Sequence, residues 1–330
     1  MRIDVESAKR NFEIRDVYNR TFSKLRVSLT NHCNLSCSYC VSGKSDQRLW
    51  TMDAEKEPLD SEALFSCVKK IHEQTNLHTI KLTGGEPLLY HELLPFIQKL
   101  NTLGIPDISI TTNGFFLKHM VKSLADLGIH NINVSLDAAT PEKYKEITKK
   151  DGYNKVMEGI GEAIKKGINI KLNTVVMKNL NHNQVLPLLD IAQDLNVEIR
   201  YLELMKMGYL FHKGQEFFYP EKLILSQIEK VFQLEEMPRE NHATARYWKT
   251  DHGVKFGIIA NESAPFCRDC NRLRLDSYGK IYGCISSWKG LDINSKSKST
   301  ELIHLLKKAL EQKQTFRFTG SPISMINIGG

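Results

Sequence analysis

The stretch "TNHCNLSCSYCVSG", residues Thr30–Gly43, is the part of this sequence that decides its fold. It places Cys33, Cys37 and Cys40 within eight residues of one another. Three thiols are too many for one disulfide and one short of the closed four-ligand shell of a structural zinc site. His32 directly precedes the first cysteine, but adjacent residues rarely ligate one metal in such a loop. A 4Fe–4S cluster held by three thiolates instead leaves one iron open to a small molecule.

The composition is that of an ordinary globular protein, with 330 residues, 41% hydrophobic and 25% charged. The net charge of +7 fits either an anionic partner or a solvated basic face. The N-terminal sequence "MRIDVESAKRNFEIRDVYNR" lacks the apolar core of a secretory signal. No apolar run is long enough to span a membrane. We therefore expect a cytoplasmic protein without a membrane partner.

Short apolar runs alternate with helical segments between Lys24 and Leu204. Gly104, Gly128 and Gly167 follow three of the helical segments as C-caps. Repeated βα units predict a parallel sheet with right-handed crossovers, either open and doubly wound or curled into a partial barrel. The expected strands are Leu25–Leu29, Thr79–Leu82, Ile108–Thr111, Ile132–Leu136, Ile170–Val176 and Val197–Leu204.

These strands alternate polar and apolar residues, whereas buried parallel strands usually read as continuous apolar runs. Arg26, Lys81 and Lys171 each fall on the polar face of their strand. The pattern predicts a sheet whose inner face is wet and partly cationic, which suits a large polar ligand. An antiparallel sheet with one solvated face is the alternative, and the long helical connections argue against it.

The regular alternation of strand-like and helical segments ends after Met205. We therefore divide the chain into an N-terminal extension (1–23), a barrel (24–204) and a C-terminal region (205–330). In the last region, "TARYWKTDHGVKFGIIAN" predicts a β-hairpin. A helix is expected around 301–312.

A second group of thiols lies in "PFCRDCNRLRLDSYGKIYGC", which holds Cys267, Cys270 and Cys284. A zinc ribbon would need a second CxxC or a nearby histidine, but His304 falls in the predicted helix. Three cysteines again indicate a cluster with an open iron. Cys67 stands alone at helical spacing and is expected in the core.

The spacing C-x3-C-x2-C with Tyr39 before the last cysteine, followed by "TGGEPLL" and "SLDA", resembles the radical S-adenosylmethionine (SAM) enzymes. In that family the open iron binds SAM, and its reductive cleavage gives a 5'-deoxyadenosyl radical. The family fold is a partial (βα)6 TIM-like barrel, an α/β fold. The resemblance implies that the residues around SAM are Tyr39, Gly84, Gly85, Glu86, Ser135 and Met205.

The segment C-x2-C-N-R-x-R, the third cysteine fourteen residues later and the terminal Gly-Gly narrow the resemblance to the GTP 3',8-cyclases of molybdenum-cofactor (molybdopterin) biosynthesis. It covers nearly the whole chain, from about Thr21 to Gly330. It implies two 4Fe–4S clusters, the second in a C-terminal auxiliary extension. It also implies radical cyclisation of GTP to (8S)-3',8-cyclo-7,8-dihydroguanosine 5'-triphosphate, a lyase reaction.

The resemblance implies roles for further residues. The residues expected around GTP are Arg26, Lys81, Thr112, Lys171, Arg272, Leu273 and Arg274. The residues expected to have catalytic roles are Arg26, Lys171, Arg200, Gly329 and Gly330. Because Thr112 has the opposite parity to Ser109 and Thr111, its strand is expected to end or bulge just before it.

The implied partners are GTP, a reducing protein such as flavodoxin or ferredoxin, and a downstream cyclic pyranopterin monophosphate synthase. A homodimer is compatible with the resemblance, and no nucleic acid is expected. Lys81 stands where relatives have Arg, and Thr79 where some carry a second basic residue, so another nucleotide is an alternative substrate. A radical SAM enzyme with an auxiliary cluster that modifies a peptide is a separate alternative. A zinc-binding nucleic-acid module is the alternative from a different class.

Overall fold

The computed structural model describes residues 14–40, 57–293 and 298–329, and within them the strands join into one twelve-stranded sheet. The strand order is β12-β11-β10-β1-β2-β3-β4-β5-β6-β9-β8-β7. All six expected strands are present, within a residue or two of their expected ends. The strands are β1 (Lys24–Ser28), β2 (Thr79–Thr83), β3 (Asp107–Thr112), β4 (Asn131–Ser135), β5 (Asn169–Val176), β6 (Glu198–Glu203), β7 (Leu234–Met237), β8 (Arg246–Thr250), β9 (Lys255–Ile259), β10 (Arg272–Leu275), β11 (Lys280–Tyr282) and β12 (Leu291–Asp292).

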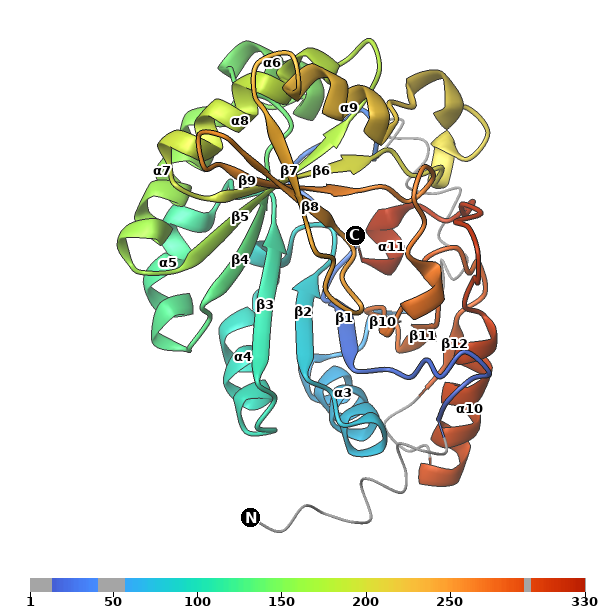
Figure 1. The fold of residues 1–330 in the computed structure, drawn as a ribbon. Coiled ribbons are helices and arrows are strands. Elements are labelled where there is room, and N and C mark those ends of the chain that lie inside the picture. Colours follow the sequence, from blue (N-terminus) through green and yellow to red (C-terminus); the bar gives the residue numbers. More distant parts are fainter. Residues whose placement is uncertain (1–13, 41–56, 294–297, 330) are drawn as a thin grey trace.

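The strands β1 to β6 pair in parallel and in sequence order, each connected to the next through helix on the outer side of the sheet (Figure 1). Asp60 caps α3 by accepting from the backbone N–H of Ala63, and Thr140 caps α6 in the same way. The α-helices are α3 (Ser61–Thr75), α4 (Leu93–Asn101), α5 (Leu117–Asp126), α6 (Pro141–Thr148), α7 (Tyr153–Lys165), α8 (Val185–Asp194), α9 (Glu221–Ile228), α10 (Ser299–Glu311) and α11 (Met325–Ile328). The short 3₁₀ helices are η1 (Pro87–Leu89), η2 (His182–Gln184), η3 (Gly208–Leu210), η4 (Gly214–Phe217) and η5 (Cys267–Asp269).

The C-terminal region is built into both edges of this sheet. Strand β10 pairs in parallel with β1, and β9 pairs in parallel with β6. The remaining strands add antiparallel pairs outside these two, and β8 with β9 forms the predicted hairpin. The expectation of a partial barrel is therefore confirmed, with a parallel strand from the C-terminal region on each side of the six βα strands.

The alternation of residues along the strands follows from their two different faces. Leu25 and Val27 of β1, with Ile80 and Leu82 of β2, are buried in the main hydrophobic core. Because successive side chains of a strand point to opposite faces, the residues between them point inward. The polar face predicted from the sequence is therefore the inner face of the curved sheet.

Among the described residues, no helix has the length and apolar character needed to cross a membrane.

Gly283 tests how tightly the second cysteine group is packed against α10. A Cβ at this position would lie 1.6 Å from the carbonyl oxygen of Ala309. We predict that Gly283→Ala destabilises the ligand-free chain by about 3 kcal/mol, the upper range for overpacking, because α10 must move away. Urea unfolding followed by circular dichroism measures this change.

Gly161→Ala is the matched control, since a Cβ there meets nothing within 4 Å on α7. Alanine stabilises a helix interior by about 1 kcal/mol relative to glycine, so this variant is expected to be slightly more stable than the parent. Equal stability of the two variants would contradict the packing described here.

Candidate active site

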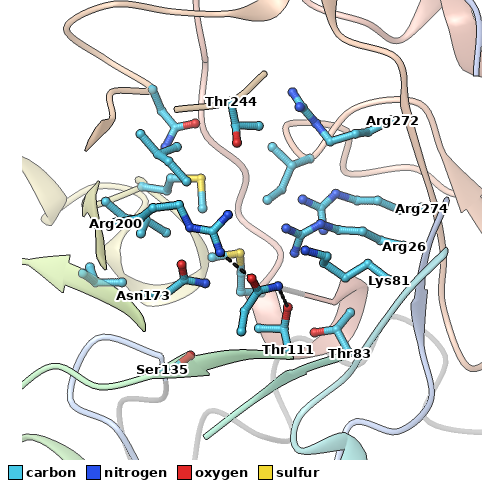
Figure 2. Close-up of a pocket in the computed structure, with 18 of the residues that line it drawn as sticks. Arg26, Lys81, Thr83, Thr111, Ser135, Asn173, Arg200, Thr244, Arg272 and Arg274 are labelled. Carbon is cyan, nitrogen blue, oxygen red and sulfur yellow. Dashed lines mark hydrogen bonds between the residues drawn. The ribbon is translucent and has the colours of Figure 1, made fainter. Parts of the chain in front are cut away.

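Both cysteine groups open onto one cavity of about 560 Å³ inside the curved sheet. This shared cavity is the arrangement that two cooperating clusters require. The cysteines that line it are Cys33, Cys37, Cys40, Cys267, Cys270 and Cys284. Figure 2 shows cationic side chains converging on the space between the walls.

The first cysteine group lies in the loop after β1. The backbone N–H of Cys40 donates to the carbonyl of Cys37 at 3.0 Å, which folds the CxxC segment into a turn. The Sγ of Cys33 accepts from the backbone N–H of Leu35 at 3.4 Å and from Nδ2 of Asn113 at 3.7 Å. Hydrogen bonds to sulfur of this kind orient a thiolate ligand.

The glycines after β2 bring this loop and the sheet into close contact. A Cβ on Gly85 would lie 2.2 Å from the carbonyl oxygen of His32, so only glycine fits. Gly84 has φ +155, and both glycines line the cavity. The carboxylate of Glu86 is fully buried and does not line the cavity. It accepts from the hydroxyl of Thr112 and from backbone N–H groups of Asn113 and Leu88, so it fixes the ends of β2 and β3.

The other residues expected around SAM also line the cavity. Ser135 ends β4, and Met205 follows β6. The hydroxyl of Tyr39 donates to the carboxylate of Asp137 at 2.7 Å. Asp137 also accepts from the backbone N–H of Val175 at 2.8 Å, and burial raises its pKa to about 6. Asp137 therefore ties the first cysteine loop to β5.

The second cysteine group repeats the same local turn. The backbone N–H of Cys270 donates to the carbonyl of Cys267 at 3.3 Å, and the Sγ of Cys284 accepts from the backbone N–H of Ser286 at 3.4 Å. Unlike Cys33 of the first group, Cys270 accepts from a charged donor. The ammonium of Lys313 lies 3.3 Å from the Sγ of Cys270.

Cations stand side by side on the wall formed by β10, β1 and β2. Arg26 is in register with Arg274 on one neighbouring strand and with Lys81 on the other. Two residues earlier on β1 and β10, Lys24 is in register with Arg272. Neighbouring strands lie about 4.8 Å apart, so like charges directly opposite destabilise the sheet.

The electrostatic cost of this wall is visible in its pKa shifts. Burial and the charges of Arg274, Arg272 and Arg200 hold the pKa of Arg26 well below its usual range. Burial, then Arg26 and Arg200, likewise lower the pKa of Lys81. A wall of cations that repel one another is a site for a polyanion, which would relieve the repulsion.

Arg200 faces these cations from β6, on the opposite side of the cavity (Figure 2). Its guanidinium donates to the side-chain oxygen of Asn133. Lys171, by contrast, does not line the cavity. Its ammonium pairs with Glu198 at 3.1 Å, and Glu198 also accepts from the hydroxyl of Tyr247.

The expected strand end at Thr112 was wrong. Strand β3 continues through Thr112, which stays in regular register with Val134 of β4. Its polar side chain lies on the face opposite to Ser109 and Thr111 without disrupting the strand, because its hydroxyl donates to Glu86 at 2.6 Å. Thr112 still lines the cavity, whereas the side chain of Leu273 is fully buried in the core and does not. A contact between Leu273 and a ligand would therefore have to use its backbone.

The C-terminal tail lies against the barrel strands β1 and β2. Gly329 has φ +74, and a Cβ there would lie 2.7 Å from Thr83 and 3.2 Å from Ser28. The guanidinium of Arg274 donates to the backbone carbonyl of Gly329. Glycine is therefore needed at 329, while Gly330 lies outside the described residues.

Each thiol triad matches the protein ligands of a 4Fe–4S cluster, in which three thiolates bind three different irons and leave the fourth iron open. Within the described ranges, no compact group of three or more His, Cys, Asp or Glu side chains is arranged to hold a single metal ion. Burial raises the pKa of Cys40 to about 12 and that of Cys267 to about 11, so the positive charge of bound iron is needed to keep these thiols ionised.

Cys270 differs from the other cysteines in its electrostatics. Burial opposes its ionisation, but Arg272 and Lys313 lower the pKa of Cys270 to about 6. The second triad is therefore partly prepared for an anionic cluster by cations of the chain itself.

Sequence reasoning missed three residues that shape the site. The side chain of Asn113 donates a hydrogen bond to the first cysteine of the first group, and Asp137 accepts one from Tyr39. Lys313 donates a hydrogen bond to a cysteine of the second group. "TTNG" and "SLDA" contain the first two directly after strands, where site residues of parallel sheets gather. Lys313 lies in the featureless "LEQKQT", and nothing in the local sequence distinguishes it.

Comparison with known proteins defines the class. The model of the radical SAM superfamily matches residues 27–192, and that described as Molybdenum Cofactor Synthesis C matches residues 197–318. Among solved structures, SuiB of Streptococcus suis has a TM-score of 0.64 at 15% identity, covering 92% of this chain and 70% of that chain. A structure described as native anSMEcpe with bound AdoMet has a TM-score of 0.58 at 17% identity, covering 88% and 82%. The chain is a radical SAM protein.

Closer relatives define the family within this class. A GTP 3',8-cyclase of Nautilia profundicola is 36% identical over 277 residues, covering 82% of this chain and 83% of that protein. A GTP 3',8-cyclase of Synechocystis is 33% identical over 320 residues, covering 96% and 94%. The chain belongs to the GTP 3',8-cyclase family.

Lys81 allows a direct test of the cationic wall. Its folded-state pKa is lowered, so between that value and the unfolded value near 10.4 the unfolded chain binds more protons than the folded chain. The free energy of unfolding therefore rises with pH across this window. We predict that Lys81→Met flattens this slope, stabilises the ligand-free chain at neutral pH and weakens binding of inorganic tripolyphosphate. Urea unfolding at several pH values and calorimetric titration measure these effects.

Lys122→Met is the control, because Lys122 is an exposed lysine on α5. This variant is expected to leave both the pH slope and tripolyphosphate binding unchanged. A Lys81→Met chain that is less stable than the parent at neutral pH would contradict the repulsion inferred for this wall.

Proposed function

We propose that this protein catalyses the radical SAM cyclisation of GTP to (8S)-3',8-cyclo-7,8-dihydroguanosine 5'-triphosphate, the first step of molybdenum-cofactor biosynthesis. The observation that carries the proposal is the single cavity lined by both cysteine groups, with a wall of cations on the adjoining strands. Membership of the GTP 3',8-cyclase family supports the same substrate.

On one side of the cavity, Cys33, Cys37 and Cys40 would hold a 4Fe–4S cluster that binds SAM. SAM bound there supplies a 5'-deoxyadenosyl radical when one electron is delivered. The two glycines after β2 let the loop that carries the cysteines pack closely against the end of β2, at the cavity wall. Ser135 and Met205 would contact SAM, while the Tyr39–Asp137 hydrogen bond fixes the loop that carries the cluster.

On the other side, Cys267, Cys270 and Cys284 would hold the second 4Fe–4S cluster. The cations of β10, β1 and β2 bind the triphosphate of GTP, since a polyanion removes their mutual repulsion. Arg26, Lys81 and Arg274 form the centre of this wall, with Arg272 at its edge. Arg200 supplies a cation from the facing wall.

The remaining residues act through position. Lys171 acts through its ion pair with Glu198, which orders the inner face of β5 and β6. Thr112 holds Glu86 and thus the end of β2. The tail packs against β1 and β2, with Gly329 held by Arg274, and would help to exclude water from the bound substrate.

We also propose the partners and location that follow from this reaction. A one-electron donor such as flavodoxin or ferredoxin would reduce the protein, and a cyclic pyranopterin monophosphate synthase would consume the product. Both the substrate and such donors are cytoplasmic, so the protein is expected to act there, as a monomer or homodimer.

Anaerobic reconstitution with iron and sulfide tests the proposal. Two cuboidal clusters predict about eight irons per chain. Addition of SAM, dithionite and GTP is expected to give 5'-deoxyadenosine and the cyclised nucleotide, measured by chromatography and mass spectrometry. SAM cleavage with no cyclised product from GTP would retain the radical chemistry and refute the substrate.

Cys284→Ala separates the two cysteine groups functionally. It removes one ligand of the second triad and leaves the first triad intact, so cyclisation is expected to fall by at least about 100-fold, as for loss of a metal-site partner, while iron at the first triad remains. Cys67→Ala is the control, because Cys67 is buried in α3 away from the cavity, and it is expected to retain both clusters and activity. Undiminished cyclisation in Cys284→Ala would show that the second triad is not part of the site.

A further inference from the structure

Lys313 makes an unusual set of contacts beneath the second cysteine group. It follows α10 and its side chain is only 6% exposed. Its Nζ donates to the Sγ of Cys270 at 3.3 Å, to the carbonyl of Arg272 at 2.8 Å and to the carbonyl of Gly283 at 3.0 Å. A charged ammonium has three N–H donors, and these three acceptors use all of them. The geometry therefore fits a buried positive charge.

The contacts of Lys313 join the separate segments that carry the second triad. The carbonyl of Arg272 belongs to the segment after Cys270, and the carbonyl of Gly283 directly precedes Cys284. A single ammonium therefore bridges two carbonyls that are eleven positions apart in the sequence. Loss of this group would remove a donor from the buried carbonyl of Gly283 and from the partly buried carbonyl of Arg272 and thiol of Cys270, which is costly.

The N-terminal segment fixes the lysine from the other side. The Nζ of Lys313 lies 5.0 Å from the centre of the Phe22 ring, within the range of a cation–π contact. Arg20 donates to the carbonyl of Cys267 at 3.0 Å and to that of Gln314 at 2.6 Å. Arg20 thus links the residue that follows Lys313 to the second triad.

The first triad is surrounded differently. The Sγ of Cys33 accepts from a backbone N–H and from the amide of Asn113, both of which are neutral donors. Glu86 and Asp137 place carboxylates near the first cysteine loop, and the ammonium of Lys150 reaches the loop at the carbonyl of Asn34, 3.2 Å away, and not at a sulfur. One triad therefore has an ammonium hydrogen-bonded to a ligand sulfur, whereas the donors to Cys33 in the other are neutral.

We propose that Lys313 is a positioning residue that holds the two segments of the second triad together and raises the reduction potential of the cluster bound there. This inference rests on the proposed function, in which that triad holds a 4Fe–4S cluster. One-electron reduction adds a negative charge to the cluster without making or breaking a bond. A hydrogen-bonded ammonium at a ligand sulfur stabilises the reduced form more than the oxidised form.

The test uses the full chain with Cys33, Cys37 and Cys40 replaced by alanine, so that only the second cluster is present. Its potential is measured by anaerobic titration with dithionite, followed by electron paramagnetic resonance, and iron is counted in the same samples. Lys313→Met is expected to shift the potential to a more negative value. Lys313→Arg, which retains the charge, is expected to keep the potential close to that of the parent chain.

The converse chain provides the control. With Cys267, Cys270 and Cys284 replaced by alanine, Lys313→Met is expected to leave the potential of the first cluster unchanged. A second-cluster potential that Lys313→Met does not alter, at full iron content, would overturn the proposal. An equal shift of both clusters would also overturn it, because the effect would then be general and not local.

If Lys313→Met binds no iron, the potential is measured in Lys313→Gln instead, because glutamine keeps a hydrogen-bond donor and removes the charge. If Lys313→Gln loads iron, an unchanged potential overturns the proposal and a negative shift supports it. If both neutral variants lose the cluster while Lys313→Arg retains it, with unchanged circular dichroism, the positive charge at residue 313 is what holds the two segments of the triad, as proposed. Loss of the cluster in Lys313→Arg as well overturns the proposal. A parent chain with only the second triad that binds no iron refutes the proposed function itself, which separates the two failures.

Discussion

The repulsion between the cations of adjacent strands is the constraint on which the rest of this site depends. Arg274, Arg26 and Lys81 occupy one register row across β10, β1 and β2. A fold gains nothing from such a row by itself, because like charges opposite one another destabilise a sheet. The row is tolerated because the hydrophobic outer face of the same strands is deeply buried. The ligand-free site is therefore preorganised for a polyanion, because folding already brings the mutually repelling cations together before the ligand binds.

The same inner face gives the two cysteine groups their different surroundings. Each group forms a CxxC turn, and both line the cavity, but Cys33 of the first group accepts from neutral donors while Cys270 of the second accepts from the ammonium of Lys313. A radical reaction with two clusters needs SAM and its substrate in one enclosure, yet it does not need the clusters to have equal electronic properties. The C-terminal region makes this possible by adding β10 beside β1 and β9 beside β6.

Much of this arrangement could be predicted from local sequence pattern. The six parallel strands, the polar inner face and both thiol triads follow from periodicity and cysteine spacing, because each depends on neighbouring residues. The end of β3 could not be predicted, since the polar side chain of Thr112, on the face opposite to Thr111, is satisfied by a hydrogen bond to Glu86, twenty-six residues away. Lys171 was placed on the correct face, but its pairing with Glu198 removes it from the cavity wall. Lys313 acts through contacts forty-three residues away, and no local pattern records such contacts.

The central claim is that SAM and GTP meet in the one cavity that both thiol triads line. The most direct measurement uses GTP carrying deuterium at ribose C3', incubated anaerobically with the reconstituted protein, SAM and dithionite. The account predicts that deuterium appears in 5'-deoxyadenosine, together with an equal amount of cyclised nucleotide. Formation of 5'-deoxyadenosine without deuterium, in the presence of bound GTP, would contradict it.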